Sequence, residues 1–388
     1  MTRRSAGRAL DAATLRRRRL EQLLRLALTY KNCSRKELAR VLGRDPTKLV
    51  PGTGIPKLDL VVELAGVLDW PVGDVVSFLW SNHATQADAS AESPQARARA
   101  CRREALRCRR LGCYLDVVGA ATRGLQETGV APALRRRLQA ILAEAYYALW
   151  SLVEARCITR DLLDAYETQP PQSSEDRRTQ AFVYFVSGQT ARRQVSIEPQ
   201  RSKPLAAGAR RDLERALELY RRLAVDDDDE LLEGRANTCF GAMMEVDVIL
   251  GRHGPSDAVG RLSAGLDRVR DTSGLSDARL ESYGWWCIYG CNIALRHLAD
   301  ERELQQHMAV FTNKADEIAN QLDNWSMRER VFSMQYTTWQ RAAGFTCFEI
   351  PCVIDSDDVR VITGTMGRFP TFRKTGWRIL HTARIVDV

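Results

Sequence analysis

The sequence feature that most constrains the fold is a recurrent spacing of apolar residues between residues 97 and 343. Steps of three and four residues place apolar side chains on one face of a helix, whereas a half-buried strand alternates apolar and polar residues. Two stretches show the helical spacing clearly: Leu304, Met308, Phe311, Ala315, Ile318 and Leu322, and Leu280, Tyr283, Cys287, Cys291, Ala294 and Leu298. The sequence therefore predicts a mainly α protein in which successive amphipathic helices pack against one another.

The composition is typical of a water-soluble protein with more than one domain. The chain has 388 residues, of which 45% are hydrophobic and 27% are charged, and both values are ordinary for globular proteins. No run approaches the roughly 18 apolar residues of a membrane helix, and the basic N-terminal residues lack the apolar segment of a secretory signal. We expect a cytoplasmic protein whose ten cysteines are reduced and mostly buried.

The basic excess of the chain is concentrated at its N-terminal end. Residues 1–50 hold 14 Lys and Arg against 4 Asp and Glu, whereas the other 338 residues hold 43 against 45. A basic segment beside a near-neutral remainder indicates a polyanionic partner, most simply nucleic acid. The alternative interpretation is a tail that only keeps the protein soluble.

A bundle of helices is expected in residues 14–80, after a disordered basic leader in residues 1–13. Its first helix, residues 14–30, combines an apolar stripe with a run of four arginines. Because this run encircles the helix, two interpretations remain open: a solvated helix start, or side chains that contact phosphate groups. A linker rich in Ala, Ser, Gln and Asp follows in residues 81–96.

Capping and breaking residues mark the remaining helices of the bundle. Ser34 and Glu37 have the spacing of a capping box at a helix start, and Gly43 is typical of the residue after a helix end. The Asp-Pro pair at residues 45–46 favours a second start, for a helix of about one turn. Two further helices, separated by a Trp-Pro pair, complete the bundle after Pro56.

This order of elements resembles the phage-repressor/Cro-like (XRE-type) helix-turn-helix domain of many bacterial regulators. ELARVLG, from Glu37 to Gly43, is similar to the second helix and glycine turn of that family. Leu49 falls where the family has the apolar residue that fixes its third helix, and residues 56–76 match the proline-led fourth helix and the short fifth. The resemblance covers about 65 residues and implies a lambda-repressor-like head that binds double-stranded DNA.

The resemblance also implies which residues contact DNA. In this family the start of the second helix contacts the phosphate backbone, and the start of the third helix reads base edges in the major groove. The residues at and beside these positions are Ser34, Arg35, Lys36, Arg44, Thr47 and Lys48. Between Gly43 and Pro56 the chain is about three residues shorter than the family's pattern, so the third helix offers few side chains for base readout. In the alternative interpretation, the head docks a protein partner.

Residues 97–343 resemble an array of tetratricopeptide-type (TPR-like) helical hairpins. Residues 142–171 are similar to one such hairpin, and residues 216–229 to the second helix and acidic turn of another. The helix pairs recur at roughly 48 residues, rather than the 34 of consensus repeats, so we expect an irregular α-solenoid. Arrays of this kind form a concave groove that binds peptides, other helices or small ligands.

Three aromatic residues of this body are candidates for the ligand groove: Trp285, Trp286 and Tyr289. Consecutive residues point about 100° apart on a helix, so Trp285 and Trp286 cannot both face the interior of the array. One of them is therefore the better candidate for the groove. The alternative interpretation is that the aromatic residues belong to the core between helices.

Two segments are expected to depart from the helical array. Residues 344–388 are rich in Val, Ile, Thr and aromatic residues with Gly breaks, which is typical of strands. They predict a small β-rich extension with a hairpin of residues 368–372 and 377–381, which must pack on the body or on a partner. Residues 172–205 are expected to form a long loop or irregular hairpin, with one helix near residues 180–189.

The sequence contains no recognised catalytic or metal-binding motif. Cys287 and Cys291 are four residues apart, with His297 nearby, but the chain has no C-x-x-C pair, and we interpret both as core thiols. The acidic run at residues 226–230 lacks the order of a calcium loop and suits a helix start. No phosphate-binding loop, dinucleotide fingerprint or HExxH motif is present. We therefore expect no enzyme, no catalytic residues, no metal and no cofactor.

Taken together, these features predict a DNA-binding transcriptional regulator. Its head would bind DNA, and its body would bind a peptide, a protein or a small ligand, or mediate dimerisation. The arrangement resembles that of bacterial regulators that sense peptide pheromones. Since one small head binds DNA weakly, a homodimer is expected to supply a second half-site. The alternative is a non-enzymatic scaffold for protein interactions, and neither function requires a membrane.

Overall fold

The computed structural model describes most of the chain. The described residues are 33–51, 56–68, 93–227, 229–267, 275–345 and 353–385, together with scattered positions between 16 and 28 and between 70 and 79. The chain divides into two compact units. We call residues 1–90 with 359–367 the head, and residues 91–358 with 368–388 the helical body.

The head contains the capping box that the sequence predicts. Helix α2 (Arg35–Val41) begins after Ser34, whose hydroxyl oxygen accepts a hydrogen bond from the Glu37 amide (3.3 Å). In return, the Ser34 amide donates to the Glu37 carboxylate (2.7 Å). Gly43 follows the helix with a φ of 58°, a conformation that glycine adopts at little cost. Both local predictions are confirmed.

One hydrophobic core cluster joins the described helices of the head between residues 20 and 79. Helix α3 (Leu58–Leu68) contributes six buried residues to it. The described residues between 16 and 28 are helical, and they bury Leu20, Leu23, Leu24 and Ala27 in the same core. The predicted apolar stripe of the first helix is therefore confirmed.

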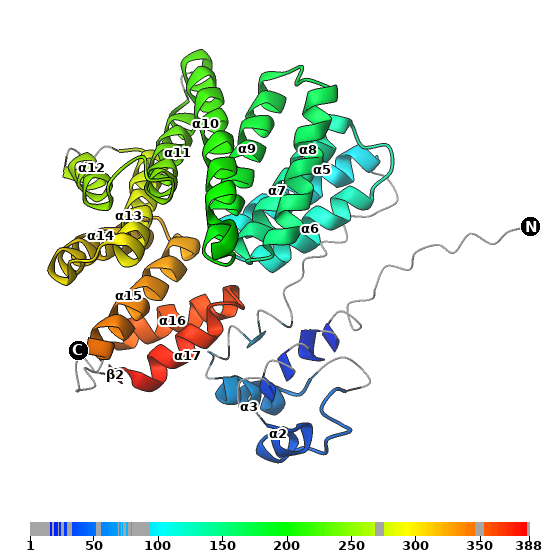
Figure 1. The fold of residues 1–388 in the computed structure, drawn as a ribbon. Coiled ribbons are helices and arrows are strands. Elements are labelled where there is room, and N and C mark those ends of the chain that lie inside the picture. The colour runs from blue at the N-terminus through cyan, green and yellow to red at the C-terminus, as the bar shows by residue number, and fades with distance from the viewer. Residues whose placement is uncertain are drawn as a thin grey trace, which may run out of the picture. The chain divides into compact units, whose positions relative to one another are not determined.

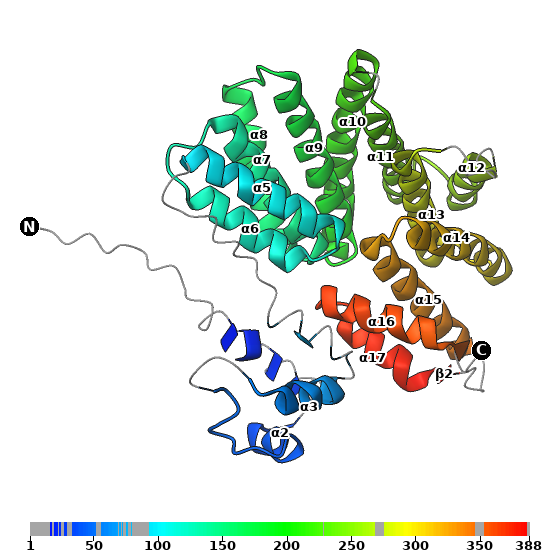
Figure 2. The same ribbon diagram turned by 180° about the vertical axis from the view of Figure 1, so that it is seen from behind.

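The helical body is built of antiparallel helices that pack against their neighbours in the chain (Figures 1 and 2). They are α5 (Pro94–Arg110), α6 (Tyr114–Gln126), α7 (Pro132–Ala148), α8 (Leu152–Thr168), α9 (Ser174–Val195), α10 (Ser202–Asp227), α11 (Glu230–Ile249), α12 (Pro255–Asp267), α13 (Asp277–His297), α14 (Glu301–Gln321) and α15 (Trp325–Phe345), with a short 3-10 helix η1 (Pro199–Arg201) before α10. Alternate helices also touch: α7 packs on α9, α11 on α13, and α13 on α15. The prediction of a mainly helical protein is confirmed.

Helix α9 corrects the prediction of a long loop in residues 172–205. It runs for 22 residues and buries polar side chains as well as apolar ones. Gln189, Thr190 and Arg192 are all at most 6% exposed and are hydrogen-bonded. A helix that is surrounded on several sides has no single apolar stripe, so its sequence lacks the periodicity by which surface helices are recognised.

The core of the helical body supports the interpretation of Cys287 and Cys291 as structural thiols. Cys287 and Cys291 belong to α13 and face the helices packed against it, and both are 0% exposed. Burial raises the pKa of the Cys287 thiol to about 12, and such a thiol is a poor metal ligand. Within the described residues, no cluster of His, Cys, Asp or Glu has the arrangement of a metal site.

The β-hairpin predicted near the C-terminus is wrong. Residues 356–368 form helix α16 (Ser356–Arg368), and residues 373–382 form helix α17 (Arg373–Thr382). The only strands in the described ranges are β1 (Val353–Ile354) and β2 (Arg384–Ile385), which pair in parallel. Ile362 and Met366 are buried four residues apart on α16, and Ile379 is buried on α17, so tertiary packing overrides the strand propensity of this segment.

None of the helices in the described ranges is both long and apolar enough to span a membrane.

Candidate functional sites

The segment after α2 forms one hydrogen-bonded turn, where the sequence predicted a short helix. The Asp45 carboxylate accepts hydrogen bonds from the Thr47 amide (2.8 Å) and hydroxyl, and these bonds lower the pKa of Asp45. The Lys48 amide donates to the Asp45 carbonyl (2.9 Å). Residues 46–50 are turn and bend, because the Asp45 side chain takes amide donors that would otherwise start a helix.

Two of the predicted DNA-binding residues hold the head together. Arg44 forms an ion pair with Asp59 at the start of α3. Arg35 at the start of α2 donates from Nε to the carbonyl of Pro46 (3.1 Å). Both guanidinium groups thus hold the turn against the two helices. Because they are engaged in these contacts, they are less able to reach DNA.

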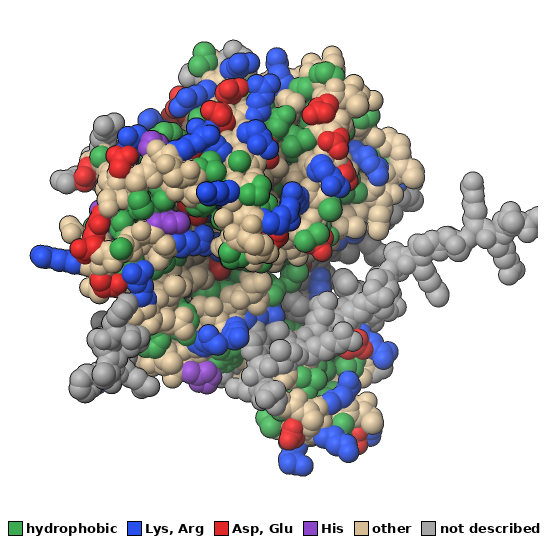
Figure 3. Space-filling model, in the orientation of Figure 1, with side chains coloured by type: hydrophobic (Ala, Val, Ile, Leu, Met, Phe, Trp, Pro, Cys, Tyr) green, Lys and Arg blue, Asp and Glu red, His purple; other side chains and the backbone are tan. Residues whose placement is uncertain are grey.

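The other predicted residues, Ser34, Lys36, Thr47 and Lys48, are exposed. Arg40 is also exposed and lies four residues after Lys36, on the same face of α2. The sequence reasoning missed Arg40, although the i, i+4 spacing was available. The described surface of the head thus carries cations on α2 and on the following turn, and Figure 3 shows Lys and Arg side chains exposed on it.

The helical body encloses a cavity of about 480 Å³. Its walls come mainly from alternate helices, α7, α9, α11, α13 and α15, with further residues from α5 and α6. The lining on α13 recurs every four residues: Asp277, Glu281, Trp285 and Tyr289. The stripe overlaps the core at one end, because Tyr289 is 2% exposed and also belongs to the core cluster that α13 shares with α9, α10 and α11.

The structure separates the three aromatic candidates. Trp285 and Tyr289 line the cavity. The Trp285 Nε1 donates to the Glu281 carboxylate (3.3 Å), and the Tyr289 hydroxyl accepts from Gln189 Nε2 (2.7 Å). Trp286 is 8% exposed and belongs to the core. The two tryptophans therefore point in different directions, with Trp285 on the cavity wall and Trp286 in the core, and a role of Trp285 in ligand binding stays a prediction.

The cavity wall also carries arginines that the sequence reasoning missed. Arg109 makes a two-point contact with Glu144 (2.5 and 2.6 Å). Arg193 is only 8% exposed, and it donates from Nη1 to the Tyr147 carbonyl (2.7 Å). Its guanidinium carbon lies 3.7 Å from the centroid of the Tyr147 ring and 4.8 Å from that of Trp150. Burial, together with the nearby charge of Arg330, lowers the pKa of Arg193 to about 9.

Comparisons with known proteins do not place the chain in a family. No family model matches it, and no curated protein matches it. Among solved structures, the crystal structure of Bacillus thuringiensis PlcR in complex with the peptide PapR7 and DNA aligns with 81% of this chain and 98% of that chain. The sequence identity is 12% and the TM-score is 0.35. Because this similarity is too low to carry an argument, the functional inference depends on the residues and geometry of the chain itself.

Proposed function

We propose that the protein is a DNA-binding transcriptional regulator whose helical body binds a ligand. One observation carries the proposal: the basic excess of the chain lies in residues 1–50, and the described part of this segment is a compact helical head with exposed cations. The resemblance of the head to XRE-type helix-turn-helix domains supports the same function. The cavity in the body supports ligand binding.

The geometry of the turn favours contacts with phosphate over base readout. A single turn after Gly43 presents Thr47 and Lys48, but Thr47 is already hydrogen-bonded to Asp45. Lys36, Arg40 and Lys48 are cations in exposed positions, as phosphate contacts require. We therefore propose that most of the affinity is electrostatic and that sequence is read by few side chains or through the shape of the DNA.

The finer features of the proposal follow from this arrangement. We propose that the body is an irregular, TPR-like array whose groove is the cavity beside Trp285 and Tyr289. A peptide, a protein segment or a small molecule would occupy that cavity. A homodimer would bring two heads to DNA, since one head with few contacts binds weakly.

A second function is favoured by apolar side chains on the head. Val41 is 68% exposed, Leu58 is 69% exposed and Val62 is 46% exposed. Leu58 and Val62 are four residues apart on α3 and therefore share a face of that helix, and an exposed apolar face suits the docking of a protein. In this alternative the head binds a protein partner, and its cations keep it soluble.

A titration of the full chain against labelled mixed-sequence duplex DNA at several salt concentrations tests the proposal. DNA binding predicts an affinity that falls steeply with salt, with a slope of about 0.9 per phosphate contact. The double variant Lys36→Ala/Lys48→Ala should lower this slope by the amount that corresponds to about two phosphate contacts.

The matched control removes the same charge from the helical body. Lys203 and Lys374 are exposed there, and the variant Lys203→Ala/Lys374→Ala should bind DNA like the wild type. Equal losses of DNA affinity in both double variants would show that the affinity depends only on the net charge of the chain. Absence of salt-dependent binding by the wild-type chain would reject the DNA-binding function and favour protein docking.

A further inference from the structure

A small cleft beside the large cavity is lined by four arginines. It has a volume of about 40 Å³. The arginines are Arg192, Arg193, Arg296 and Arg330, the lining also includes Trp150 and Trp285, and it has no acidic side chain. Arg193, Trp285 and Arg330 line the large cavity as well, so the two spaces adjoin. We call the small space the arginine cleft.

The carboxylates around the arginine cleft do not balance its cations. Arg192 and Arg296 share one partner, Glu245, with N–O distances of 2.6 and 3.6 Å. Arg330 pairs with Glu329 (3.1 Å). Within the described residues, no carboxylate lies within ion-pair distance of Arg193. Four guanidinium groups therefore converge where two carboxylates are available, and both carboxylates are paired with other arginines.

Arg193 is the cation that this imbalance affects most. A buried charge costs several kcal/mol unless it is paired and hydrogen-bonded. Arg193 contacts a carbonyl oxygen and two aromatic faces, and the nearby charge of Glu329, which is paired with Arg330, compensates it only in part. The lowered pKa of Arg193 has the same origin, because burial and the charge of Arg330 both disfavour its protonated form. An anion in the cleft would supply the missing opposite charge.

The backbone beside the cleft is strained as well. Trp150 follows α7 with a φ of 63°, a left-handed conformation that usually needs glycine. Such strain persists only where surrounding contacts impose the conformation. The ring of Trp150 lies 4.8 Å from the Arg193 guanidinium carbon and 4.7 Å from that of Arg330. The tryptophan thus fixes two arginines of the cleft.

We propose that the arginine cleft binds the carboxylate of a ligand whose remaining atoms lie in the large cavity. This inference deepens the proposed function, on which it rests, by naming the chemical class that the body would sense. A volume of about 40 Å³ holds about three water-sized groups, which suits the three heavy atoms of a carboxylate better than the five of a phosphate. The planar fork of arginine also matches a carboxylate in two-point contacts.

Two sources could supply this carboxylate: a small organic acid or the C-terminus of a peptide. The apolar part of either would lie against the Trp285 ring, at the junction of the two spaces. The large cavity, with a volume of about 480 Å³, falls in the range of sites for small molecules and short peptides. The experiment therefore needs one probe of each kind.

Thermal unfolding of the full chain in the presence of matched acid and amide probes tests the proposal. The first pair is 3-phenylpropionate and 3-phenylpropionamide, and the second is the peptide Ala-Ala-Phe with a free or an amidated C-terminus. Ionic strength is held constant with sodium chloride, and inorganic phosphate is a separate arm. A ligand that binds only the folded state raises the melting temperature in proportion to its affinity. We expect each acid to raise it more than its amide does, and the larger shift of the two acids identifies the source.

Variants of α9 assign the effect to the cleft. Arg193→Met should lower the affinity for the acid at least tenfold, as judged from the concentration dependence of the shift. Arg177→Met is the matched control, because it removes an exposed arginine from the same helix outside both spaces, and it should preserve the preference for acid. If Arg193→Met does not fold, Arg193→Lys retains the charge without the two-point fork and should weaken binding less than tenfold.

Three results would overturn the proposal: equal shifts with acid and amide in both pairs, an unchanged preference in Arg193→Met, or a larger shift with phosphate than with either acid. The experiment contains no DNA. A failure of DNA binding and a failure of the cleft are therefore observed separately.

Discussion

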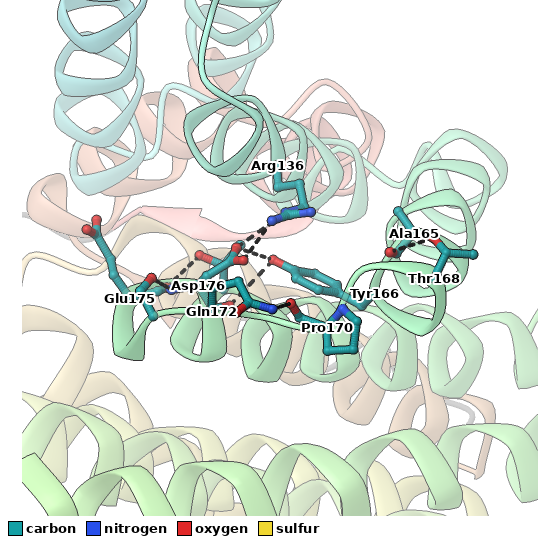
Figure 4. A network of polar contacts seen from close by, with 10 residues as sticks. Arg136, Ala165, Tyr166, Thr168, Pro170, Gln172, Glu175 and Asp176 are labelled. Carbon is teal, nitrogen blue, oxygen red and sulfur yellow. Dashed lines mark hydrogen bonds and ion pairs between the residues drawn. The ribbon is translucent and has the colours of Figure 1, made fainter.

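Replacement of Asp176 should strongly destabilise the helical body, because this carboxylate closes a buried polar network (Figure 4). Asp176 is 2% exposed. It accepts hydrogen bonds from Arg136 Nη2 (2.7 Å) and from the Tyr166 hydroxyl (2.9 Å). The Arg136 guanidinium also lies 4.9 Å from the centroid of the Tyr166 ring. Since the three residues belong to α9, α7 and α8, the network joins three helices.

The expected loss for Asp176→Ala follows from what remains behind. The Arg136 side chain is 14% exposed, so it becomes a nearly buried cation without a carboxylate. Breaking a buried ion pair by removing one partner costs about 3–5 kcal/mol. Because Arg136 retains some contact with water, we expect the lower end of this range, about 3 kcal/mol, including the lost bond from Tyr166.

Urea unfolding followed by far-ultraviolet circular dichroism measures this loss. Asp161→Ala is the control, because the Asp161 side chain is 70% exposed on α8 and its loss should change the free energy of unfolding by less than about 0.5 kcal/mol. The double variant Asp176→Leu/Arg136→Met should recover most of the stability, since it leaves no buried charge. A loss below about 1 kcal/mol in Asp176→Ala, or no recovery in the double variant, would refute the reasoning.

Two further predictions concern the packing of the body. A Cβ on Gly234 would lie 2.5 Å from the carbonyl oxygen of Ala278, so Gly234→Ala should push α11 away from α13 and lower the free energy of unfolding by about 1–3 kcal/mol. Gly208→Ala is the control, because its Cβ would meet only the end of an arginine side chain at 3.9 Å. It should be neutral or stabilising by up to about 1 kcal/mol. Urea unfolding measures both changes, and equal changes in the free energy of unfolding would contradict the close contact between α11 and α13. Cys157 is exposed, whereas Cys287 is buried with its pKa raised to about 12 by burial. Mass spectrometry after brief iodoacetamide treatment at pH 8 should therefore find Cys157 alkylated and Cys287 unmodified, and early modification of Cys287 would show that the core opens.

Local signals in the sequence predicted local structure well. The capping box of Ser34 and Glu37 and the glycine after α2 depend on residues within one helical turn, so a short stretch suffices to predict them. The core stripe of α13 was predicted for the same reason. The short helix after Asp45 was not formed, because a side-chain turn at Asp45 competes with helix initiation, and sequence alone does not decide between the two.

Features that depend on distant residues were missed. Helix α9 is polar on faces that are buried, and its glutamine, threonine and arginines are compensated by partners such as Tyr289 and Glu245, 100 and 53 residues away. Helices α16 and α17 have strand-like composition, which tertiary packing overrides. The arginine cleft had no signal in the sequence, because its four arginines are far apart in the chain or lie among many other arginines, and only the packing of the helices brings them together.

The arginines of the cleft come from different helices, and this affects how the body could respond to a ligand. Arg193 belongs to α9, Arg296 to α13 and Arg330 to α15, while Glu245 on α11 is shared between two of the cations. A carboxylate held by several of these guanidinium groups favours the arrangement in which they converge, and its binding energy is lost when α9 and α15 separate. A ligand shifts an equilibrium only by its difference in affinity between two states. An acidic ligand would bind this cleft more tightly when the helices meet, because only then is its charge compensated. A neutral ligand of the same shape would lack this difference in affinity.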